Sequence, residues 1–577
     1  MGRDGNQRTT GLIVVVVCLL TAVALPAGVA DASPATVAGS AESPATAAGS
    51  AESPATVAGS AEAPPGEHVH MCAAEPPDDH ADPDGDTSEV VGWVDGYWYD
   101  EPLEIDDSEL TEDELEELVL RTAARVEAIR CLTFEELPPV EVLTREEYRE
   151  SVEPDFENVS DEEWQFEDAR LATMLVAGQG EDAEQLHFEV QTAFPAAFYD
   201  TEEEYIGFIT DDPDRIEVDQ VTLAHELTHA LQDQHFDLER IFDKQTNDEF
   251  VAALAVAEGD ATVVDEKYED NCNRETWADE CIVQPVGDAD EPPSWPLVLD
   301  LLAAYHTPLV AERADDGDWD DVDALYEQFP SSTAETIYPE RYSEFERAQV
   351  TVDDESDADW ERIEIEDDDG EREAFDIVGQ HGLTAILVAP AYETDGVRTV
   401  ADPNEFTQAH IGGDLDYSIT ETTGWQGDRL HGYTNDDGEE AGVWKLDWED
   451  DGEAETFAAA YADLIEYRGG EPAEGYENVY TFEEVDGWEM AVAIEQRGDR
   501  VLVVTAPTPD DLTAVHAAVE LEATETPTPE EPTPGESTST PTLGEPTPTD
   551  ETVVGFGVAL AVFALVGTTL LVSRRRS

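Results

Sequence analysis

The stretch of residues 222–236, TLAHELTHALQDQHF, constrains this chain more than any other. Its apolar residues recur at helical spacing, and Asp219 or Thr222 can cap the first turn. His225 and His229 are four residues apart, and side chains at that spacing lie one above the other on the same face of a helix. The sequence therefore predicts a helix whose two imidazoles reach one point in space.

Glu226 follows the first histidine and completes the pattern H-E-x-x-H. This pattern resembles the metal-binding helix of zinc peptidases. The resemblance implies one Zn²⁺ ion bound by His225 and His229, with Glu226 as the general base that takes a proton from the attacking water. The plainer interpretation is an amphipathic helix that happens to carry two histidines.

A tetrahedral catalytic zinc site needs a third protein ligand and an open position. Glu258 lies in the apolar-periodic segment LAVAEGDATVVDEKY, which predicts a second helix, and a glutamate from a second helix resembles the gluzincin arrangement. His235 is the alternative metal ligand, because metzincins place a histidine ten residues after the first. Residues 232–234 hold no glycine to turn the chain back, so Glu258 is the predicted ligand. Asp260 and Asp265 are candidate hydrogen-bond acceptors for the ligand imidazoles.

Later motifs extend the resemblance to a group of secreted proteins of bacteria and archaea. Besides the two helices, these proteins share a P-x-S-T…P-E-[KR]-Y segment, here residues 330–342, and a G-W-x-G-D-R segment, here residues 424–429. The resemblance covers residues 110–500 and implies a gluzincin-like fold.

Four more residues are candidate contacts for the substrate or the transition state. Tyr338 stands where many of these relatives have a histidine, and its phenol can serve as a hydrogen-bond donor. Tyr305 and His306 are candidates of the same kind, and Arg429 can hold a substrate carboxylate. As plainer interpretations, the first three are packed side chains and Arg429 forms a structural salt bridge.

The chain is extremely acidic, with 139 acidic against 27 basic residues and a formal net charge of -112. Self-repulsion of this size disfavours a compact state in dilute buffer, whereas molar salt shortens the screening length to about 3 Å. The composition resembles that of proteins from halophilic archaea. It excludes nucleic acid as a partner, because no basic patch exists to contact phosphates.

The N-terminal end has the features of a secreted protein. Residues 1–32 predict a signal peptide, with arginines before an apolar run and small residues after it. Residues 33–92 are a linker that opens with three copies of an Ala/Ser/Pro-rich decapeptide, which has too few large apolar side chains to form a core.

The C-terminal end predicts a surface anchor. Residues 522–552 are a Thr/Pro/Glu-rich stalk, residues 553–572 are uncharged and long enough to span a bilayer, and residues 573–577 are a basic tail that stays cytoplasmic. Together they resemble the PGF-CTERM sorting signal, which implies removal by an archaeosortase and a lipid anchor, although Val554 replaces the usual proline. Either way, membrane attachment and an outward-facing folded part are expected.

Between these ends we expect an α+β fold in two regions. Residues 93–350 predict a mostly helical zincin-like region with a β-hairpin at 196–210, and residues 351–521 an α+β half. Capping boxes predict helices that begin after Thr111 and Ser160. Further expectations are a helical stretch at 295–313, an exposed acidic loop at 351–370 and a final helix at 509–521.

Four cysteines follow the predicted signal peptide, and an even count outside the cell predicts two disulfides. Cys272 with Cys281 is the local pairing, which leaves Cys72 with Cys131. Asn158 begins the one N-glycosylation sequon.

Two functions compete. The first is a cell-surface zinc metallopeptidase that acts on peptides or proteins. The second is a non-catalytic envelope protein that uses the same scaffold for binding or architecture. The retained Glu226 favours the enzyme, because a structural zinc site needs no base.

Overall fold

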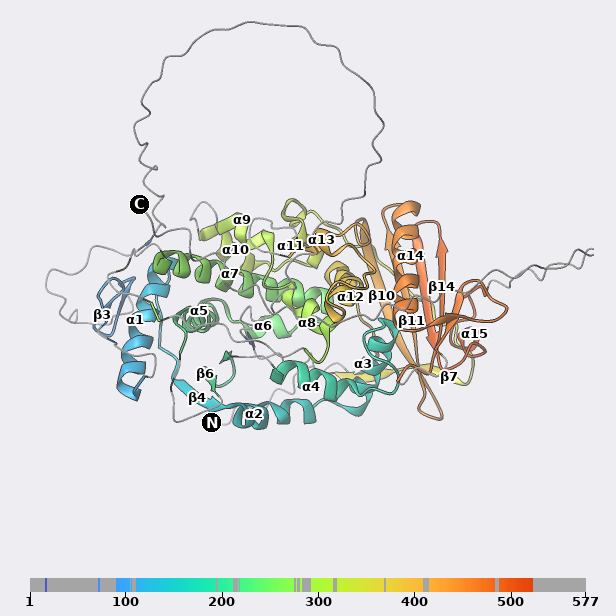
Figure 1. The fold of residues 1–577 in the computed structure, drawn as a ribbon, viewed down its shortest axis with the longest axis horizontal. Helices are drawn as coiled ribbons and strands as arrows, with labels where there is room; N and C mark the ends of the chain where they lie inside the picture. The colour runs from blue at the N-terminus through green and yellow to red at the C-terminus, as the bar shows by residue number, and fades with distance from the viewer. Residues whose placement is uncertain are drawn as a thin grey trace, which may run out of the picture. The chain divides into compact units, whose positions relative to one another are not determined.

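The structure, a computed structural model, describes most of the chain between residues 90 and 521 and two short stretches before it. The described residues are 16–17, 71–72, 90–103, 105, 110–193, 196–210, 216, 218–273, 277, 281–282, 292–314, 319–367, 370–407, 415–482 and 487–521. All of them belong to one compact unit, Met1–Thr524. Helices and strands are mixed in this unit (Figure 1), which confirms the prediction of a mixed helix-and-sheet fold.

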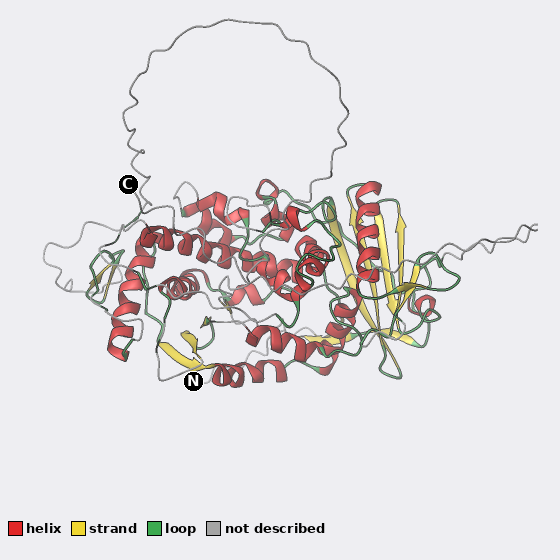
Figure 2. Cartoon of the chain, in the orientation of Figure 1, coloured by secondary structure: helices red, strands yellow, loops and turns green. Residues whose placement is uncertain are grey.

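Helices dominate the part of the unit that precedes residue 350 (Figure 2). They are α1 (Glu112–Arg130), α2 (Arg145–Glu157), α3 (Asp161–Thr173), α4 (Ala183–Ala193), α5 (Gln220–Phe236), α6 (Glu239–Phe242), α7 (Asn247–Asn273), α8 (Trp295–Leu302), α9 (Pro308–Ala314), α10 (Asp320–Glu327) and α11 (Thr333–Ile337), followed by a 3-10 helix at Pro339–Arg341.

The first helices begin where their capping residues predict. At the start of α1, the Thr111 hydroxyl accepts the backbone N–H of Glu114 (3.3 Å), while the Glu114 carboxylate accepts the backbone N–H of Thr111 (2.9 Å). The same reciprocal pair, Ser160 with Glu163, opens α3. Two otherwise unpaired donors of each first turn are satisfied in this way. Both predicted helix starts are confirmed.

A small sheet contacts these helices. Its strands are β1 (Val16–Val17), β4 (Val140–Thr144), β5 (Ala197–Asp200) and β6 (Tyr205–Thr210), in the order β1-β5-β6-β4. β5 and β6 form the predicted antiparallel hairpin, β4 pairs with β6 in parallel, and β1 pairs with β5 in antiparallel register. A hydrogen bond from the Tyr199 hydroxyl to Asp233 (3.1 Å) ties β5 to α5.

The larger sheet lies in the later part of the unit. Its seven strands follow the order β12-β13-β14-β15-β11-β10-β7, and every neighbouring pair is antiparallel. The strands are β7 (Trp360–Arg362), β10 (Trp425–Asn435), β11 (Glu440–Trp448), β12 (Glu471–Pro472), β13 (Val479–Thr481), β14 (Ala491–Arg497) and β15 (Arg500–Ala506). Two hairpins stand apart from both sheets, β2 (Trp93–Val94) with β3 (Tyr97–Trp98) and β8 (Glu364–Asp367) with β9 (Gly370–Glu373). The remaining helices are α12 (Gly379–Glu393), α13 (Pro403–Phe406), α14 (Asp451–Tyr467) and α15 (Leu512–Val515).

The larger sheet joins the helical part through one of its faces. Gly442 and Trp444 are two residues apart on β11 and therefore point to the same side. Gly442 packs against Thr173 of α3, and Trp444 packs edge-on to Tyr461 of α14. The Tyr461 hydroxyl donates to the Thr173 carbonyl oxygen (2.6 Å). One hydrophobic cluster consequently runs from α1 to β15, so the two predicted regions share a core.

Three predicted elements are wrong in detail. The stretch 295–313 is two helices, because Pro308 lacks an N–H and biases the residue before it away from helical geometry. The segment 351–370 is not all loop, since buried Trp360 begins β7, which pairs with β10. The final helix is only α15, because Ala517 after it donates to the Glu355 carbonyl (3.2 Å) instead of continuing the helix.

Both predicted disulfides are confirmed, Cys72–Cys131 and Cys272–Cys281. Asn158 is exposed at the end of α2. No helix in the described part of the chain is long and apolar enough to cross a membrane. The predicted stalk, span and tail lie outside the described residues, as do the signal peptide, except for Val16–Val17, and most of the linker.

Candidate metal centre

Helix α5 carries the H-E-x-x-H pattern and is fixed at its start by Asp219. The Asp219 carboxylate accepts the backbone N–H groups of Val221 (2.8 Å) and Thr222 (3.1 Å), which makes Asp219 the N-cap. From there the helix runs unbroken to Phe236, and its apolar side chains are fully buried: Leu223, Leu227, Ala230 and Leu231. Burial of this face sets the rotation of α5 and so the direction of its histidines.

Helix α7 packs against α5 and carries Glu258. Gly259 allows the chain segment after α8 to approach α7 closely, because a Cβ atom at position 259 would lie 2.7 Å from the methyl carbon of Thr307. On α7, Asp260 is fully buried and accepts Arg130 Nε (2.8 Å) and the Tyr326 hydroxyl (2.9 Å). Asp260 therefore bonds to Arg130 and Tyr326, and the imidazole acceptor shown by the structure is not Asp260.

Replacing Asp260 is therefore expected to weaken the fold and not the metal centre. Asp260→Ala leaves the Arg130 guanidinium buried without its main partner, which costs about 3–5 kcal/mol of stability. Zinc affinity of the folded protein should change by less than threefold. Chemical denaturation in molar salt and zinc titration of the same sample measure the two effects separately.

Three side chains from α5 and α7 converge: His225, His229 and Glu258. Glu258 Oε2 lies 3.3 Å from His225 Nε2 and 3.5 Å from His229 Nε2, and all three ligand atoms lie within 4.8 Å of one another. The three side chains are almost completely buried, with at most 2 % exposure. Burial disfavours the charged form of Glu258, but the imidazoles outweigh it and lower its pKa to about 2.

The two separations that involve Glu258 match those around a zinc ion. Ligand atoms about 2.0–2.2 Å from a tetrahedral ion lie about 3.3–3.6 Å apart, and the distances of 3.3 and 3.5 Å fall in this range. The two Nε2 atoms and Glu258 Oε2 are buried and make no hydrogen bond of good geometry with the residues that the structure describes. Buried polar atoms seldom stay without a partner, so this donor set fits a bound divalent ion.

Each ligand imidazole is oriented through its other nitrogen. His225 Nδ1 lies 2.7 Å from Asp265 Oδ2, and His229 Nδ1 lies 2.9 Å from Gln232 Oε1. An Nδ1–H that donates to these oxygens leaves the Nε2 lone pair directed at the centre of the triad. Gln232 also donates to the Ala257 carbonyl (3.0 Å), so one amide links the two helices beside Glu258. Asp265 was a candidate from the sequence, whereas Gln232 was not predicted.

Loss of the Asp265 carboxylate is expected to reduce zinc affinity by about 10–100-fold, since it fixes the orientation of His225. Asp265 is partly exposed, with 21 % of its side chain accessible, so Asp265→Ala should leave the unfolding midpoint almost unchanged. Competition with a zinc-binding dye reports the affinity. The Asp260→Ala protein is the control. If the Asp265→Ala protein bound zinc as tightly as this control, the 2.7 Å contact between Asp265 and His225 would have no role in orienting the imidazole.

Glu226 stands beside the triad on α5 and is completely buried. Neither of its carboxylate oxygens has a hydrogen-bond partner among the described residues. Burial raises its pKa to about 7, with the two imidazoles acting in the opposite direction. A carboxyl group with a pKa near neutrality can accept a proton and release it again at neutral pH.

The alternative ligand His235 is not brought to the triad. Residues 232–234 stay helical, and His235 is exposed with its Nε2 atom 2.9 Å from the Thr133 carbonyl oxygen. At 3.6 residues per turn, an unbroken helix carries a residue ten positions after His225 away from the metal-facing side.

Of the four weaker candidates, Tyr305 is the one placed against the triad. Its ring stacks on His225 with centroids 6.2 Å apart. His306 is half-buried in the turn after α8, where its backbone N–H bonds to Leu302. Tyr338 contacts α12, accepting Gln380 Nε2 at 3.1 Å.

The Arg429 side chain contacts a backbone carbonyl oxygen and an aromatic ring. Its Nε atom donates to the Val350 carbonyl (3.1 Å), and its guanidinium lies 3.9 Å above the ring of Phe375. The sequence allowed a structural salt bridge here, but these contacts are with a carbonyl oxygen and an aromatic ring.

A family model described as a domain of unknown function (DUF8575) matches residues 363–516. The matched residues begin after α5 and α7 and cover β8, β9 and all strands of the larger sheet except β7. No curated protein and no solved structure matches the chain.

Proposed function

We propose that this chain is a zinc-dependent metallopeptidase of the gluzincin type. The observation that carries the proposal is the convergence of His225, His229 and Glu258 with their ligand atoms unbonded, next to a buried Glu226. A purely structural zinc site closes its fourth position with protein and has no use for such a carboxylate.

Each residue has a defined task in this proposal. His225, His229 and Glu258 would hold one Zn²⁺ ion, which lowers the pKa of a water molecule to about 7 and polarises a peptide carbonyl. Glu226 takes the proton from the attacking water and delivers it to the leaving amine. Asp265 and Gln232 keep the imidazoles oriented for this chemistry.

The small sheet supplies a place for an extended substrate beside α5. Once residues 1–32 are removed as a signal peptide, β5 becomes the outer strand, because Val16–Val17 is its neighbour on that side. An outer strand offers unpaired backbone groups to which a peptide can add as a further strand. The hydrogen bond between Tyr199 and Asp233 keeps that strand next to the helix with the metal ligands.

A surface location accompanies the proposed activity. The two disulfides support an oxidising environment outside the cytoplasm, and the net charge of -112 suits high salt. The C-terminal segment would attach the protein to the membrane, either directly or through a lipid after archaeosortase processing. The substrates would be peptides or proteins outside the cell.

The test is to purify the protein in molar salt, determine its bound metal by mass spectrometry and assay hydrolysis of a mixed peptide pool. We expect one zinc per chain, activity that a chelator abolishes and recovery when zinc is returned. Zinc binding without hydrolysis of any peptide would favour the non-catalytic envelope protein. Absence of zinc binding would reject the peptidase and leave the non-catalytic envelope protein standing.

A further inference from the structure

The Cys272–Cys281 disulfide joins the last turn of α7 to the chain segment that caps α5. Ile282, the residue after this bridge, bonds twice to Gln220 at the start of α5. Its carbonyl oxygen accepts the backbone N–H of Gln220 (2.9 Å), and its own N–H donates to the side-chain oxygen of Gln220 (2.8 Å). The first N–H groups of a helix have no partner within the helix, so Ile282 completes the cap that Asp219 begins.

Three hydrogen bonds across the contact between α5 and α7 follow one another in antiparallel order. They are Gln220 to Tyr268 (3.2 Å), His225 to Asp265 (2.7 Å) and Gln232 to the Ala257 carbonyl (3.0 Å). The bond that orients the metal ligand His225 is the middle one. The bond between Gln220 and Tyr268 closes the end that lies next to the disulfide.

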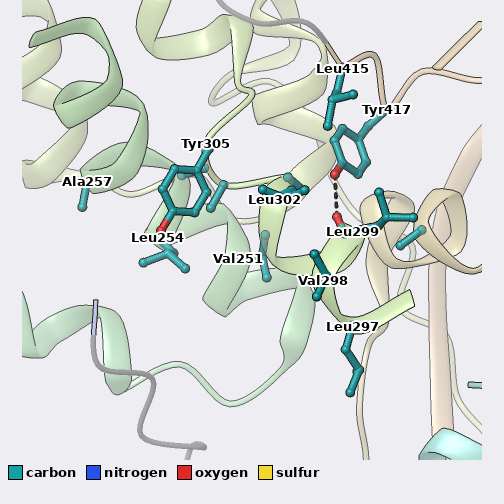
Figure 3. Close-up of a cluster of buried hydrophobic side chains, with 14 of the residues drawn as sticks. Val251, Leu254, Ala257, Leu297, Val298, Leu299, Leu302, Tyr305, Leu415 and Tyr417 are labelled. Carbon is teal, nitrogen blue, oxygen red and sulfur yellow. Dashed lines mark hydrogen bonds between the residues drawn. The ribbon is translucent and has the colours of Figure 1, made fainter. Parts of the chain in front are cut away.

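The two halves of α7 are held in different ways. The half before Glu258 is anchored in a cluster of buried apolar side chains (Figure 3), which contains Val251, Leu254 and Ala257 of this helix. After Asp265 the helix continues for about two turns, and of residues 266–273, all of them described, only Tyr268 and Asn271 are buried. The position of these last turns therefore depends strongly on Tyr268 and on the disulfide at Cys272.

The segment between the two cysteines packs onto the same end of α7. Trp277 is buried and lies edge-on to Tyr268, with ring centroids 4.5 Å apart. The guanidinium of Arg125, from α1, lies 3.7 Å from the centre of the Trp277 ring and donates to the Tyr268 hydroxyl (3.3 Å). A disulfide restricts the conformations of the segment that it closes, so it favours the contacts of Trp277 and of Ile282 together.

We propose that the Cys272–Cys281 disulfide positions Asp265 against His225 and thereby raises the zinc affinity of the metal centre. With the disulfide open, the end of α7 and the start of α5 lose their covalent link, and Asp265 spends less time within hydrogen-bond distance of His225. The imidazole is then less often in the orientation that binds zinc. The inference rests on the zinc site of the proposed function and adds its dependence on the redox state of one cysteine pair.

This dependence couples zinc binding to cysteine oxidation. When the S–S bond forms, the two thiols lose two electrons and two protons, and a small-molecule disulfide that accepts them becomes two thiols. Cys272 and Cys281 are both partly exposed, so such a reagent can reach them. The metal centre therefore reaches its full affinity in oxidising surroundings, where disulfides persist.

The test is a double-mutant cycle in the full chain that combines opening of the disulfide with removal of Asp265. Cys272→Ser together with Cys281→Ser should weaken zinc binding about three- to tenfold, less than Asp265→Ala, because the orienting carboxylate is still present. In the Asp265→Ala protein the same pair of substitutions should change zinc affinity by less than about twofold, because the group that the disulfide positions is gone. An equal loss in both proteins would overturn the inference, since the disulfide would then act on the fold as a whole.

Cys72→Ser together with Cys131→Ser is the matched control, because it opens the other disulfide, at the end of α1. Zinc affinity of this control should stay within about twofold of the unmodified protein. Tyr268→Phe is a second variant, which keeps the disulfide and the ring but removes the hydroxyl that bonds to Gln220. It should also weaken zinc binding only when Asp265 is present, and it tests the inference even if the serine variant does not fold.

Peptide hydrolysis by the same proteins separates this inference from the proposed function. Zinc affinity that depends on the disulfide through Asp265, in a protein that hydrolyses no peptide, would overturn the peptidase and leave the inference standing. Equal zinc affinity with and without the disulfide, in a protein that hydrolyses peptides, would overturn the inference and leave the peptidase standing.

Discussion

Glu226→Gln is expected to keep its zinc and to lose peptide hydrolysis by about 10²–10⁴-fold, the usual contribution of a general acid–base group. The amide has nearly the same size as the carboxyl group, and Glu226 is not one of the three converging ligands, so the metal site should remain intact. What the variant loses is the group that accepts the proton of the attacking water. Initial rates and bound zinc, measured on one preparation in molar salt, give both quantities.

Glu203→Gln provides the matched control, because it removes the same charge at an exposed turn between β5 and β6. It should retain full activity and full zinc content. If Glu226→Gln kept more than a tenth of the activity, Glu226 would not be the base.

Glu258→Ala should lose zinc altogether in a buffer where the unmodified protein is saturated. Removing one of three ligands should reduce zinc affinity more than removing Asp265, because Asp265 only orients a ligand. Because bound zinc stabilises the folded state according to its affinity, the rise in Tm on zinc addition should also disappear. Metal analysis after dialysis and thermal unfolding with and without zinc measure the two consequences.

His235→Ala is the informative comparison for Glu258→Ala, since both positions were ligand candidates. Its imidazole bonds to the Thr133 carbonyl, so zinc content and activity should stay within twofold of the unmodified protein. Loss of zinc from His235→Ala together with its retention in Glu258→Ala would exchange the two assignments.

The parts of the site that could be predicted from the sequence are those set by local rules. Spacing of four residues placed His225 and His229 on one face, and reciprocal side-chain caps fixed the starts of α1 and α3. The absence of glycine at 232–234 gave the reason why His235 stays away from the metal. Glu258 came from a motif resemblance, and its approach to the histidines depends on packing between α5 and α7 that no local rule contains.

Other features could not be predicted from the sequence, because they depend on residues that are distant in the chain. Gln232 had a local signal, three residues after His229 on the same helix, but its bond to the Ala257 carbonyl depends on the packing of α7. The strand that begins at Trp360 was not predicted, because acidic residues surround it in the sequence and its partner, β10, lies about 70 positions later.

The most direct test of the central claim is anomalous X-ray diffraction at the zinc absorption edge, from crystals of the zinc-loaded protein. The account predicts one strong peak within about 2.0–2.2 Å of His225 Nε2, His229 Nε2 and a Glu258 carboxylate oxygen. A zinc peak bound elsewhere, or a loaded ion with Glu258 outside its coordination sphere, would contradict it.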